Sequence, residues 1–297
     1  MEIPNGHQGP RSLAALVVVL ALAALDADSA GAQAVPGLEV LPDTTVMQVV
    51  ELRDGSTLYG RIVDVGPPVS FRLSSGQILT LEPASIREVR VSAGRVVNGQ
   101  VWEPDPNPTR LFFMPTARTT PAGSGYFSVY ELIIPFLSFS LTDRLMIAGG
   151  TPLIGDFDGD RPFWIAPKFK VLDGERAQVA VGLWSISTGD ADDGIYSLLF
   201  GTGTFGTSDQ ALTVGLGYGM EGTDFADSPV AVIGGELRVS RRVKLVTENW
   251  LFPGSTGFLS AGPRFMGDHL SADVGLAFLI DEADDIVFPL VNFVYSW

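Results

Sequence analysis

The stretch I-V-F-P-L-V-N-F-V-Y-S-W, residues 286–297, decides the expected fold. Successive side chains of an extended strand point to opposite faces. One face then carries Val287, Pro289, Val291, Phe293, Tyr295 and Trp297. The other carries Ile286, Phe288, Leu290, Asn292, Val294 and Ser296. A strand with one apolar face and aromatic residues at its end suits a wall whose outside is lipid and whose rim lies at the headgroup interface.

The same strand resembles the C-terminal recognition strand of bacterial outer-membrane β-barrels, which ends in an aromatic residue with apolar or aromatic residues at alternate positions before it. Phe293, Tyr295 and Trp297 carry this resemblance. It implies a bacterial outer-membrane location, contact with outer-membrane lipid, and recognition of this strand by the barrel assembly machinery.

Composition excludes several classes of function. The chain has 297 residues, no cysteine and two histidines, so disulfides and thiolate metal sites are excluded. Its net charge of -15 opposes a nucleic-acid partner, because binding phosphates requires clustered Lys and Arg. The 34 glycines and 18 phenylalanines fit closely spaced strands better than helices.

Residues 1–34 have the pattern of a secretory signal peptide. Arg11 precedes an apolar run over 13–25, and small residues then lead to Ala32-Gln33-Ala34, an A-x-A cleavage site. The run is shorter than the ~20 residues that a spanning helix needs. We expect export across the inner membrane and a mature chain that starts near Val35. An uncleaved anchor is the alternative, and the A-x-A pattern argues against it.

Residues 45–92 predict a small separate β domain. Turn pairs such as Asp54-Gly55 separate five short strands. These are Val46–Arg53, Thr57–Val65, Val69–Leu73, Gln77–Leu81 and Ile86–Val91. The phrase L-R-D-G-S-T-L-Y-G-R-I-V-D-V, with a second hairpin around S-S-G-Q, resembles Sm-like or SH3-like small barrels. Export and acidity oppose RNA binding here. Docking of a periplasmic partner is one interpretation, and a structural plug or spacer is the one we favour.

Residues 93–109 predict an extended Pro-rich linker, because Pro104, Pro106 and Pro108 interrupt strand ladders. From Arg110 onward, alternating segments are separated by turns. In Ala211–Met220 the large apolar residues alternate with small ones. Ser271–Ile280 and Phe163–Val171 repeat this pattern. The sequence therefore predicts an all-β protein, with an antiparallel transmembrane β-barrel of about 12 strands over 110–297.

Turn lengths predict the orientation of the barrel, since such barrels have short periplasmic turns and longer outer loops. Short turns are expected at 142–143, 173–174, 206–208, 240–241 and 267–268. Longer loops are expected at 119–124, 155–161, 188–194, 221–228, 252–256 and 281–285. In this scheme Arg110–Ala117 is the first strand and pairs with the last. The long loops carry most of the acidic residues within 110–297, so most of the net charge should face outward from the cell.

Charged residues at expected inward positions are the candidates that line the lumen. They are Glu131, Lys168, Lys170, Glu236, Arg238, Arg264 and Asp273. A selective pore places one sign of charge around a constriction, whereas mixed signs can pair across a closed interior. Both interpretations stay open. The Val243–Leu251 segment does not assign to faces.

An acidic motif offers a candidate metal site. Asp156, Asp158 and Asp160 alternate around Gly159, and Ca²⁺ prefers several oxygen ligands on a flexible loop. A solvated acidic loop is the interpretation we favour, because the downstream glutamate of an EF-hand is missing. No other cofactor is expected.

Enzyme activity is not expected. Enzymes on this architecture use a histidine near the outer mouth of the barrel. His269 is the only histidine of the expected mature chain, and it lies on a short turn at the expected periplasmic side. The stretch L-F-F-M-P-T-A-R followed by G-S-G-Y-F and L-T-D-R-L-M-I-A-G-G resembles uncharacterised bacterial outer-membrane β-barrel proteins, a family without an activity to transfer. The leading hypothesis is porin-like permeation of small solutes or ions. The alternatives are a non-conducting structural or surface-interaction protein and, third, a soluble lipid-binding β protein.

Overall fold

The computed structural model describes residues 35–44, 46–97, 100–153, 161–187, 195–252, 257–280 and 286–297. The predicted signal peptide lies outside these residues. The chain divides after Val91 into two compact units, which are described separately. Both are built from β-strands, as expected. No helix in the described part of the chain is long and apolar enough to cross a membrane.

The first unit is a five-stranded antiparallel sheet with the order β4-β3-β2-β1-β5. Its strands are β1 (Met47–Leu52), β2 (Thr57–Asp64), β3 (Val69–Leu73), β4 (Ile78–Leu81) and β5 (Ile86–Ser92). The five expected strands are therefore present. The order ends at β4 and β5, so the sheet is not a closed barrel, and the resemblance to Sm-like or SH3-like barrels is not confirmed.

Alternation within these strands produces the core of the first unit. Val50, Ile62, Phe71 and Ile86 are fully buried and pack together. The β1–β2 turn follows its sequence signal, since Gly55 has a φ of 88°, which a residue with a side chain rarely adopts. The Ser56 N–H donates to the Asp54 carboxylate over 2.8 Å and lowers the pKa of that carboxyl.

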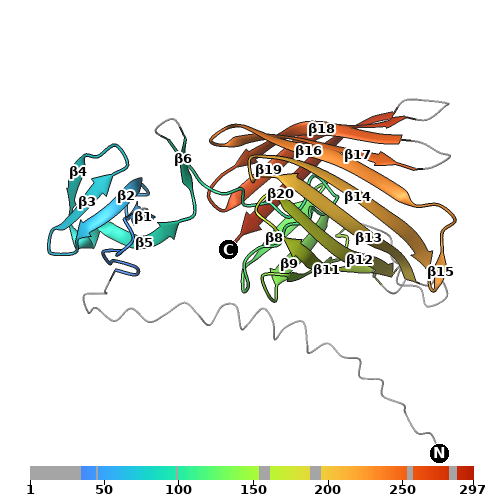
Figure 1. The fold of residues 1–297 in the computed structure, drawn as a ribbon, viewed down its shortest axis with the longest axis horizontal. Helices are drawn as coiled ribbons and strands as arrows, with labels where there is room; N and C mark the ends of the chain where they lie inside the picture. The colour runs from blue at the N-terminus through green and yellow to red at the C-terminus, as the bar shows by residue number, and fades with distance from the viewer. Residues whose placement is uncertain are drawn as a thin grey trace, which may run out of the picture. The chain divides into compact units, whose positions relative to one another are not determined.

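The second unit contains a closed antiparallel barrel of 12 strands (Figure 1). The strands are β8 (Gly125–Tyr130), β9 (Ile134–Ser140), β10 (Leu145–Gly150), β11 (Phe163–Asp173), β12 (Ala177–Ser187), β13 (Ile195–Gly206), β14 (Gln210–Glu221), β16 (Val230–Ser240), β17 (Val243–Leu251), β18 (Gly257–Met266), β19 (Leu270–Ile280) and β20 (Ile286–Ser296). Each strand pairs with its neighbours in the chain, a short β15 (Asp224–Phe225) folds back on β14, and β20 pairs with β8 to close the wall.

The strand faces agree with the sequence pattern. On β14, Leu212, Leu216 and Tyr218 are exposed on the outer surface, while Ala211 and Thr213 are buried inside. The same division holds on β11 and β19. On β20, Phe293, Tyr295 and Trp297 are exposed, whereas Leu290, Asn292 and Val294 are buried. A wall with large apolar residues outside and polar residues inside reverses the pattern of soluble proteins.

The connections at the two ends of the barrel also differ as expected. One end has only short turns, between β9 and β10, β11 and β12, β13 and β14, β16 and β17, and β18 and β19. We call it the short-turn end. The opposite end has the longer connections at 151–162, 188–194, 222–229, 252–256 and 281–285 and the short β8–β9 turn, and we call it the loop end. Of the expected long loops there, 188–194 and 281–285 lie wholly outside the described residues, and 155–161 and 252–256 do so except for one residue each.

The expected first strand over Arg110–Ala117 is wrong. The wall starts instead at Gly125, whose N–H donates to the Trp297 carbonyl, and β20 pairs with β8. The expected outer loop over Thr119–Ser124 therefore lies at the short-turn end, where the Thr119 hydroxyl donates to the Asp143 carbonyl over 2.6 Å. The run L-F-F-M has the apolar character of a strand, but it folds back on itself inside the barrel.

The expected number of strands is still reached, because a hairpin turn that the sequence did not indicate divides one expected strand into β8 and β9. Residues 131–133 connect β8 and β9 at the loop end, and the Ile133 N–H donates to the Tyr130 carbonyl over 3.0 Å. Glu131 and Leu132 have φ angles of 48° and 63°. Such hairpin turns usually contain Asn, Asp or Gly at these positions, so Y-E-L-I carries no turn signal. The strand lost at Arg110 is thereby replaced.

Replacing Leu132 with Asn is expected to raise the free energy of unfolding by about 0.5–1 kcal/mol, because the left-handed region costs a leucine about 1–2 kcal/mol and Asn tolerates it. Urea titration of the refolded protein in lipid vesicles measures this. Leu141→Asn, at an exposed leucine of the other end, serves as the control and should give no gain. Equal effects of both substitutions would contradict the strain argument.

The wall strands are shorter on one side of the barrel, so the wall there extends less far toward the loop end. β8, β9 and β10 have six, seven and six residues, whereas the other wall strands have 9 to 12. β20 pairs with β8 only over Asn292–Ser296. Its remaining part, 286–291, has no described strand beside it on that side. We call this place the seam.

Residues 93–109 differ from an extended linker. The short strands β6 (Arg95–Val97) and β7 (Gln100–Trp102) form a hairpin. After it, Asp105, Asn107 and Thr109 are buried. The prolines do prevent strand pairing over 103–109. This segment nevertheless enters the barrel, where the Asp105 carboxylate and the carbonyls of Asn107 and Thr109 accept hydrogen bonds from cations of the inner wall.

Candidate functional site: the occupied lumen

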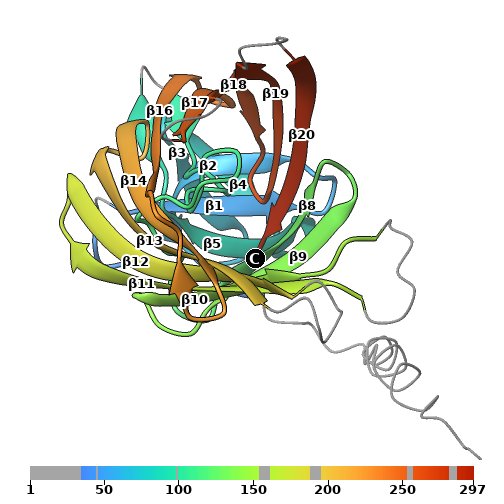
Figure 2. The same cartoon turned by 90° about the vertical axis from the view of Figure 1, so that its right-hand side faces the viewer.

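The lumen is filled by the chain itself. Residues 103–118, which we call the plug, enter from the short-turn end and fold into a tight hairpin whose tip is Phe112-Phe113. The Thr116 N–H donates to the Thr109 carbonyl, and the Leu111 N–H donates to the Met114 carbonyl, both over 2.9 Å. Figure 2 looks into the barrel from the loop end and shows the wall as a ring. A 12-stranded wall leaves more room than an eight-stranded one, whose own side chains fill it.

Arg264 is the centre of the contacts between wall and plug. Its side chain is fully buried and points inward from β18. It donates from Nε and Nη2 to Asp273 on β19, over 2.6 and 3.1 Å. Its remaining donors reach the plug, at the Asn107 carbonyl (2.6 Å), the Leu111 carbonyl (2.7 Å) and the Asp105 carboxylate (3.3 Å). One guanidinium thus joins two wall strands to the plug.

A second buried chain of charges runs beside it. Lys244 on β17 donates from Nζ to Asp105 over 2.5 Å and to Glu236 on β16 over 2.9 Å. The other oxygen of Glu236 accepts from Arg118 over 2.6 Å. Positive and negative groups therefore alternate from Arg264 through Asp105, Lys244 and Glu236 to Arg118. Such pairing satisfies charges that would be very costly to bury alone.

Two further cations, one on the wall and one on the plug, join the two. Lys168 on β11 donates to three plug carbonyls, those of Thr109, Thr116 and Arg118, over 2.6–3.2 Å. Arg110 reaches the opposite way, toward β8. It donates to the Ser128 hydroxyl over 2.6 Å, and its guanidinium lies over the rings of Tyr126, Tyr130 and Phe136 at 4.5–4.9 Å.

The tip of the plug is fixed by a carboxylate. Glu248 on β17 is fully buried and accepts from the N–H groups of Phe113 and Met114, over 2.9 and 3.0 Å. Its other oxygen accepts from the indole of Trp250 over 2.6 Å. Leu111 and Phe112 pack on Val246, Ala277 and Leu290.

The structure brings most of the lumen candidates together on the inner wall. Lys168, Glu236, Arg264 and Asp273 are buried there and belong to the contacts just described. Lys170 is buried on β11 and pairs with Asp173 over 3.0 Å.

The other two candidates lie at the two ends of the barrel. Arg238 donates to the Glu103 carbonyl over 2.7 Å and lies over the ring of Trp102, at the short-turn end. Glu131 is not on the wall. It lies in the β8–β9 turn, where its carboxylate accepts from the Val291 N–H over 3.2 Å.

Sequence reasoning missed Lys244, Glu248 and Asp105. The first two share the inner face of β17 with Val246 and Trp250. Because this face mixes apolar and charged residues, its alternation does not reveal which side faces lipid. Lys244 and Glu248 lie four residues apart and therefore on the same face of one strand. This spacing of two charges was the signal that could have identified the inner face. Asp105 lies among prolines, where no periodicity exists.

The loop-end half of the lumen is aromatic instead of charged. Above the plug, the inward-facing positions of six strands carry large rings. They are Trp164, Trp184, Tyr196, Trp250, Phe258 and Phe288. We call this region the vestibule. Trp184 keeps 45% of its surface exposed and can therefore contact a bound molecule.

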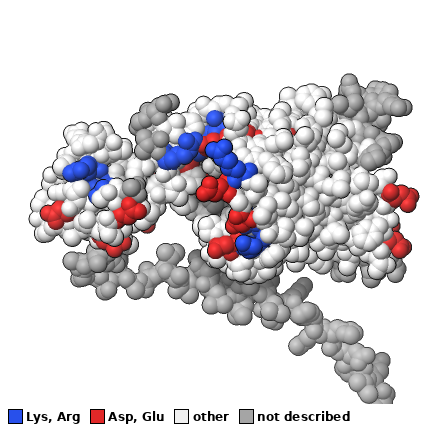
Figure 3. Space-filling view, viewed as in Figure 1, with Lys and Arg blue, Asp and Glu red and all other residues white. Residues whose placement is uncertain are grey.

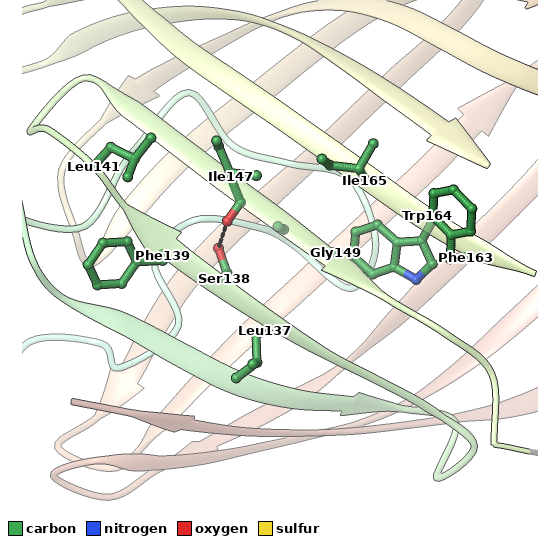
Figure 4. Close-up of a pocket in the computed structure, with 10 residues that line it drawn as sticks. Leu137, Ser138, Phe139, Leu141, Ile147, Gly149, Phe163, Trp164 and Ile165 are labelled. Atoms are coloured by element: carbon green, nitrogen blue, oxygen red, sulfur yellow. Dashed lines mark hydrogen bonds between the residues drawn. The ribbon is translucent and has the colours of Figure 1, made fainter. Parts of the chain in front are cut away.

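The outer surface of the wall is apolar between two charged ends. On the face shown in Figure 3, the charged side chains of the barrel gather at its two ends, and the middle of the wall is largely free of them. A shallow groove of about 380 Å³ lies on this outer surface, over β9, β10 and β11. Figure 4 shows Leu137, Phe139 and Ile165 around it, with Gly149 at its floor. It is a hollow in the lipid-facing wall and not an entrance to the lumen.

The remaining candidates are the acidic motif and His269. Asp156, Asp158 and Asp160 lie outside the described residues. Among the residues that the structure describes, no three His, Asp or Glu side chains gather as a metal site. His269 lies in the β18–β19 turn, 3.1 Å from the Ser296 carbonyl.

Comparisons with known proteins identify no family. No family model matches the chain, and no curated protein matches it. Among solved structures, a KdgM porin superposes with a TM-score of 0.44 and 7% identity, covering 59% of this chain and 98% of the porin. A KdgM porin in complex with disordered oligogalacturonate gives the same values. At this identity and TM-score the likeness indicates neither a substrate nor a mechanism.

Proposed function

We propose that the protein is an outer-membrane β-barrel that its own plug keeps closed in the resting state. The buried network of Arg264, Asp105 and Lys244 carries this proposal, because the charges that could have lined an ion path are neutralised by the segment that fills the lumen. The apolar outer wall supports membrane insertion. We further propose that the short-turn end faces the periplasm and that residues 45–92 act as a spacer there.

Planar-bilayer recordings of the refolded full-length protein test the closed state. We expect no sustained current over a range of voltages, because the paired charges and the apolar plug tip exclude a continuous column of water and ions. Insertion should be verified on the same sample by heat-modifiable migration on a gel. A stable open level in the unmodified protein would overturn the proposal.

Permeation of small solutes is the second candidate, and the nature of the contacts favours it. The plug binds the wall mainly through hydrogen bonds and ion pairs, whose groups water can solvate once the plug leaves. A barrel that opens only when the plug is displaced would therefore keep a polar inner wall on its short-turn half.

A further inference from the structure

The vestibule is a built aromatic site with an apolar floor. Phe258 and Phe288 pack against the cluster formed by Leu111, Phe112 and Leu290, so the plug tip closes the vestibule from below. Trp184 contacts Trp164 with ring centroids 6.2 Å apart. Rings that remain partly exposed above a closed floor can take up an apolar group, because its burial removes apolar surface of both partners from water.

The seam lies beside this vestibule, since Phe288 of β20 faces inward within 286–291. Over 286–291 the backbone groups of alternate β20 residues face the place where a strand would pair. Glu131 satisfies both backbone polar groups of Val291. The Glu131 N–H donates to the Val291 carbonyl over 2.9 Å, and the Glu131 carboxylate accepts from the Val291 N–H. The next residue with this orientation is Pro289, which has no N–H to satisfy.

This arrangement indicates an edge that is built to stay unpaired. Open strand edges facing lipid are normally excluded, since their N–H groups would lack partners. Proline and capping carboxylates are the means by which proteins tolerate such edges. Pro289 and Glu131 remove two successive donors from the edge. The neighbouring residues Val287 and Leu132 are apolar and exposed, so lipid chains can approach this edge.

We propose that the seam admits the alkyl chain of a single-chain amphiphile from the membrane into the vestibule, with the polar head at the loop-end rim. The rim favours a neutral or cationic head, because Glu221, Asp224 and Asp227 are exposed there, against Arg161. This inference deepens the proposed function, since it rests on a membrane-inserted barrel with a plug as floor.

Fluorescence quenching tests occupancy of the vestibule. The chain contains no cysteine, so Phe288→Cys can be labelled selectively with bimane in protein reconstituted into nanodiscs. The probe is a dodecyl maltoside that carries a nitroxide near the chain end. We expect saturable quenching at position 288, and only linear quenching at the lipid-facing control Leu276→Cys. Linear quenching at both positions would overturn the inference and leave the closed barrel untouched.

A ring deletion tests whether the aromatic residues bind the chain. Trp184→Ala is expected to weaken the affinity measured from the saturable quenching about tenfold, since a large aromatic contact is lost. Phe278→Ala removes an exposed ring on the outer face and should leave the affinity unchanged. A cationic head should bind at least as well as maltoside, and a sulfate head more weakly. Equal effects of the two ring deletions, or tightest binding of the sulfate, would contradict the site.

Photo-crosslinking tests the route. Benzoylphenylalanine at position 289 should crosslink to a tritiated dodecyl maltoside, and excess unlabelled amphiphile should compete for it. The same group at Leu276 should give only uncompeted crosslinks. Saturable quenching at 288 without competed crosslinking at 289 would overturn the seam as entrance. A conducting wild-type protein that still shows saturable quenching would instead contradict the closed barrel alone.

Discussion

Replacing residues 103–118 with a glycine–serine linker of equal length is expected to turn a closed barrel into a conducting pore. Each wall strand pairs with the next, and β20 pairs with β8 over Asn292–Ser296, so the plug is not needed to close the wall. A wall of 12 strands lies between the eight-stranded barrels that side chains fill and the 16-stranded ones that hold a water channel. Without the plug, water should enter the short-turn half.

The charges left behind predict the selectivity of that pore. Removal of the plug takes away its own charges, which are of both signs, and the described inner wall that remains carries more cations than carboxylates. The cations are Lys168, Lys170, Arg238, Lys244 and Arg264, and the carboxylates are Glu236, Glu248 and Asp273. We expect weak anion selectivity, read as a reversal potential in a KCl gradient.

A matched variant distinguishes the effect of the plug on conductance from that of the first unit. Deleting residues 47–91 keeps 103–118 and should give a barrel that stays closed. If the plug replacement shows no current although its migration on a gel proves that it has folded, the lumen is closed by something other than the plug.

Replacing Arg264 with Met is expected to lower the free energy of unfolding by about 3–5 kcal/mol, because it leaves Asp273 and part of the Asp105 charge buried without their cation. Methionine retains most of the volume, so loss of packing contributes little. Urea titration in lipid vesicles, followed by tryptophan fluorescence, measures the change.

Two further variants show whether charge is the cause. Arg144→Met, at an exposed turn, should change the unfolding free energy by less than about 0.5 kcal/mol. Adding Asp273→Leu to Arg264→Met should recover a large part of the loss, since replacing both members of a buried pair by apolar residues is close to neutral. No recovery in the double variant would mean that the hydrogen bonds from Arg264 to the plug carbonyls, and not the ion pair, carry the stability.

The wall of the barrel could be predicted because its information is local. On β14, for example, Leu212 and Leu216 alternate with Thr213 and Gly215, and lipid outside against a polar interior requires this period of two wherever the chain crosses. The five short strands of the first unit follow from their turns in the same way. The turn at Glu131-Leu132 could not be predicted, because its positive φ angles are imposed by the pairing of β8 with β9 and β20 and not by turn residues.

The sequence by itself determined most of the strands, most of the outward faces and most of the inward charges. Only the tertiary structure decided that Arg110–Ala117 fills the lumen, that Lys168 and Arg264 bind it, and that Glu131 and Pro289 border a seam. The physical reason is the range of the forces. Alternation is set by each strand's own two environments, whereas the plug depends on partners such as Asp105 and Lys244, 139 positions apart, that meet only after the wall has closed.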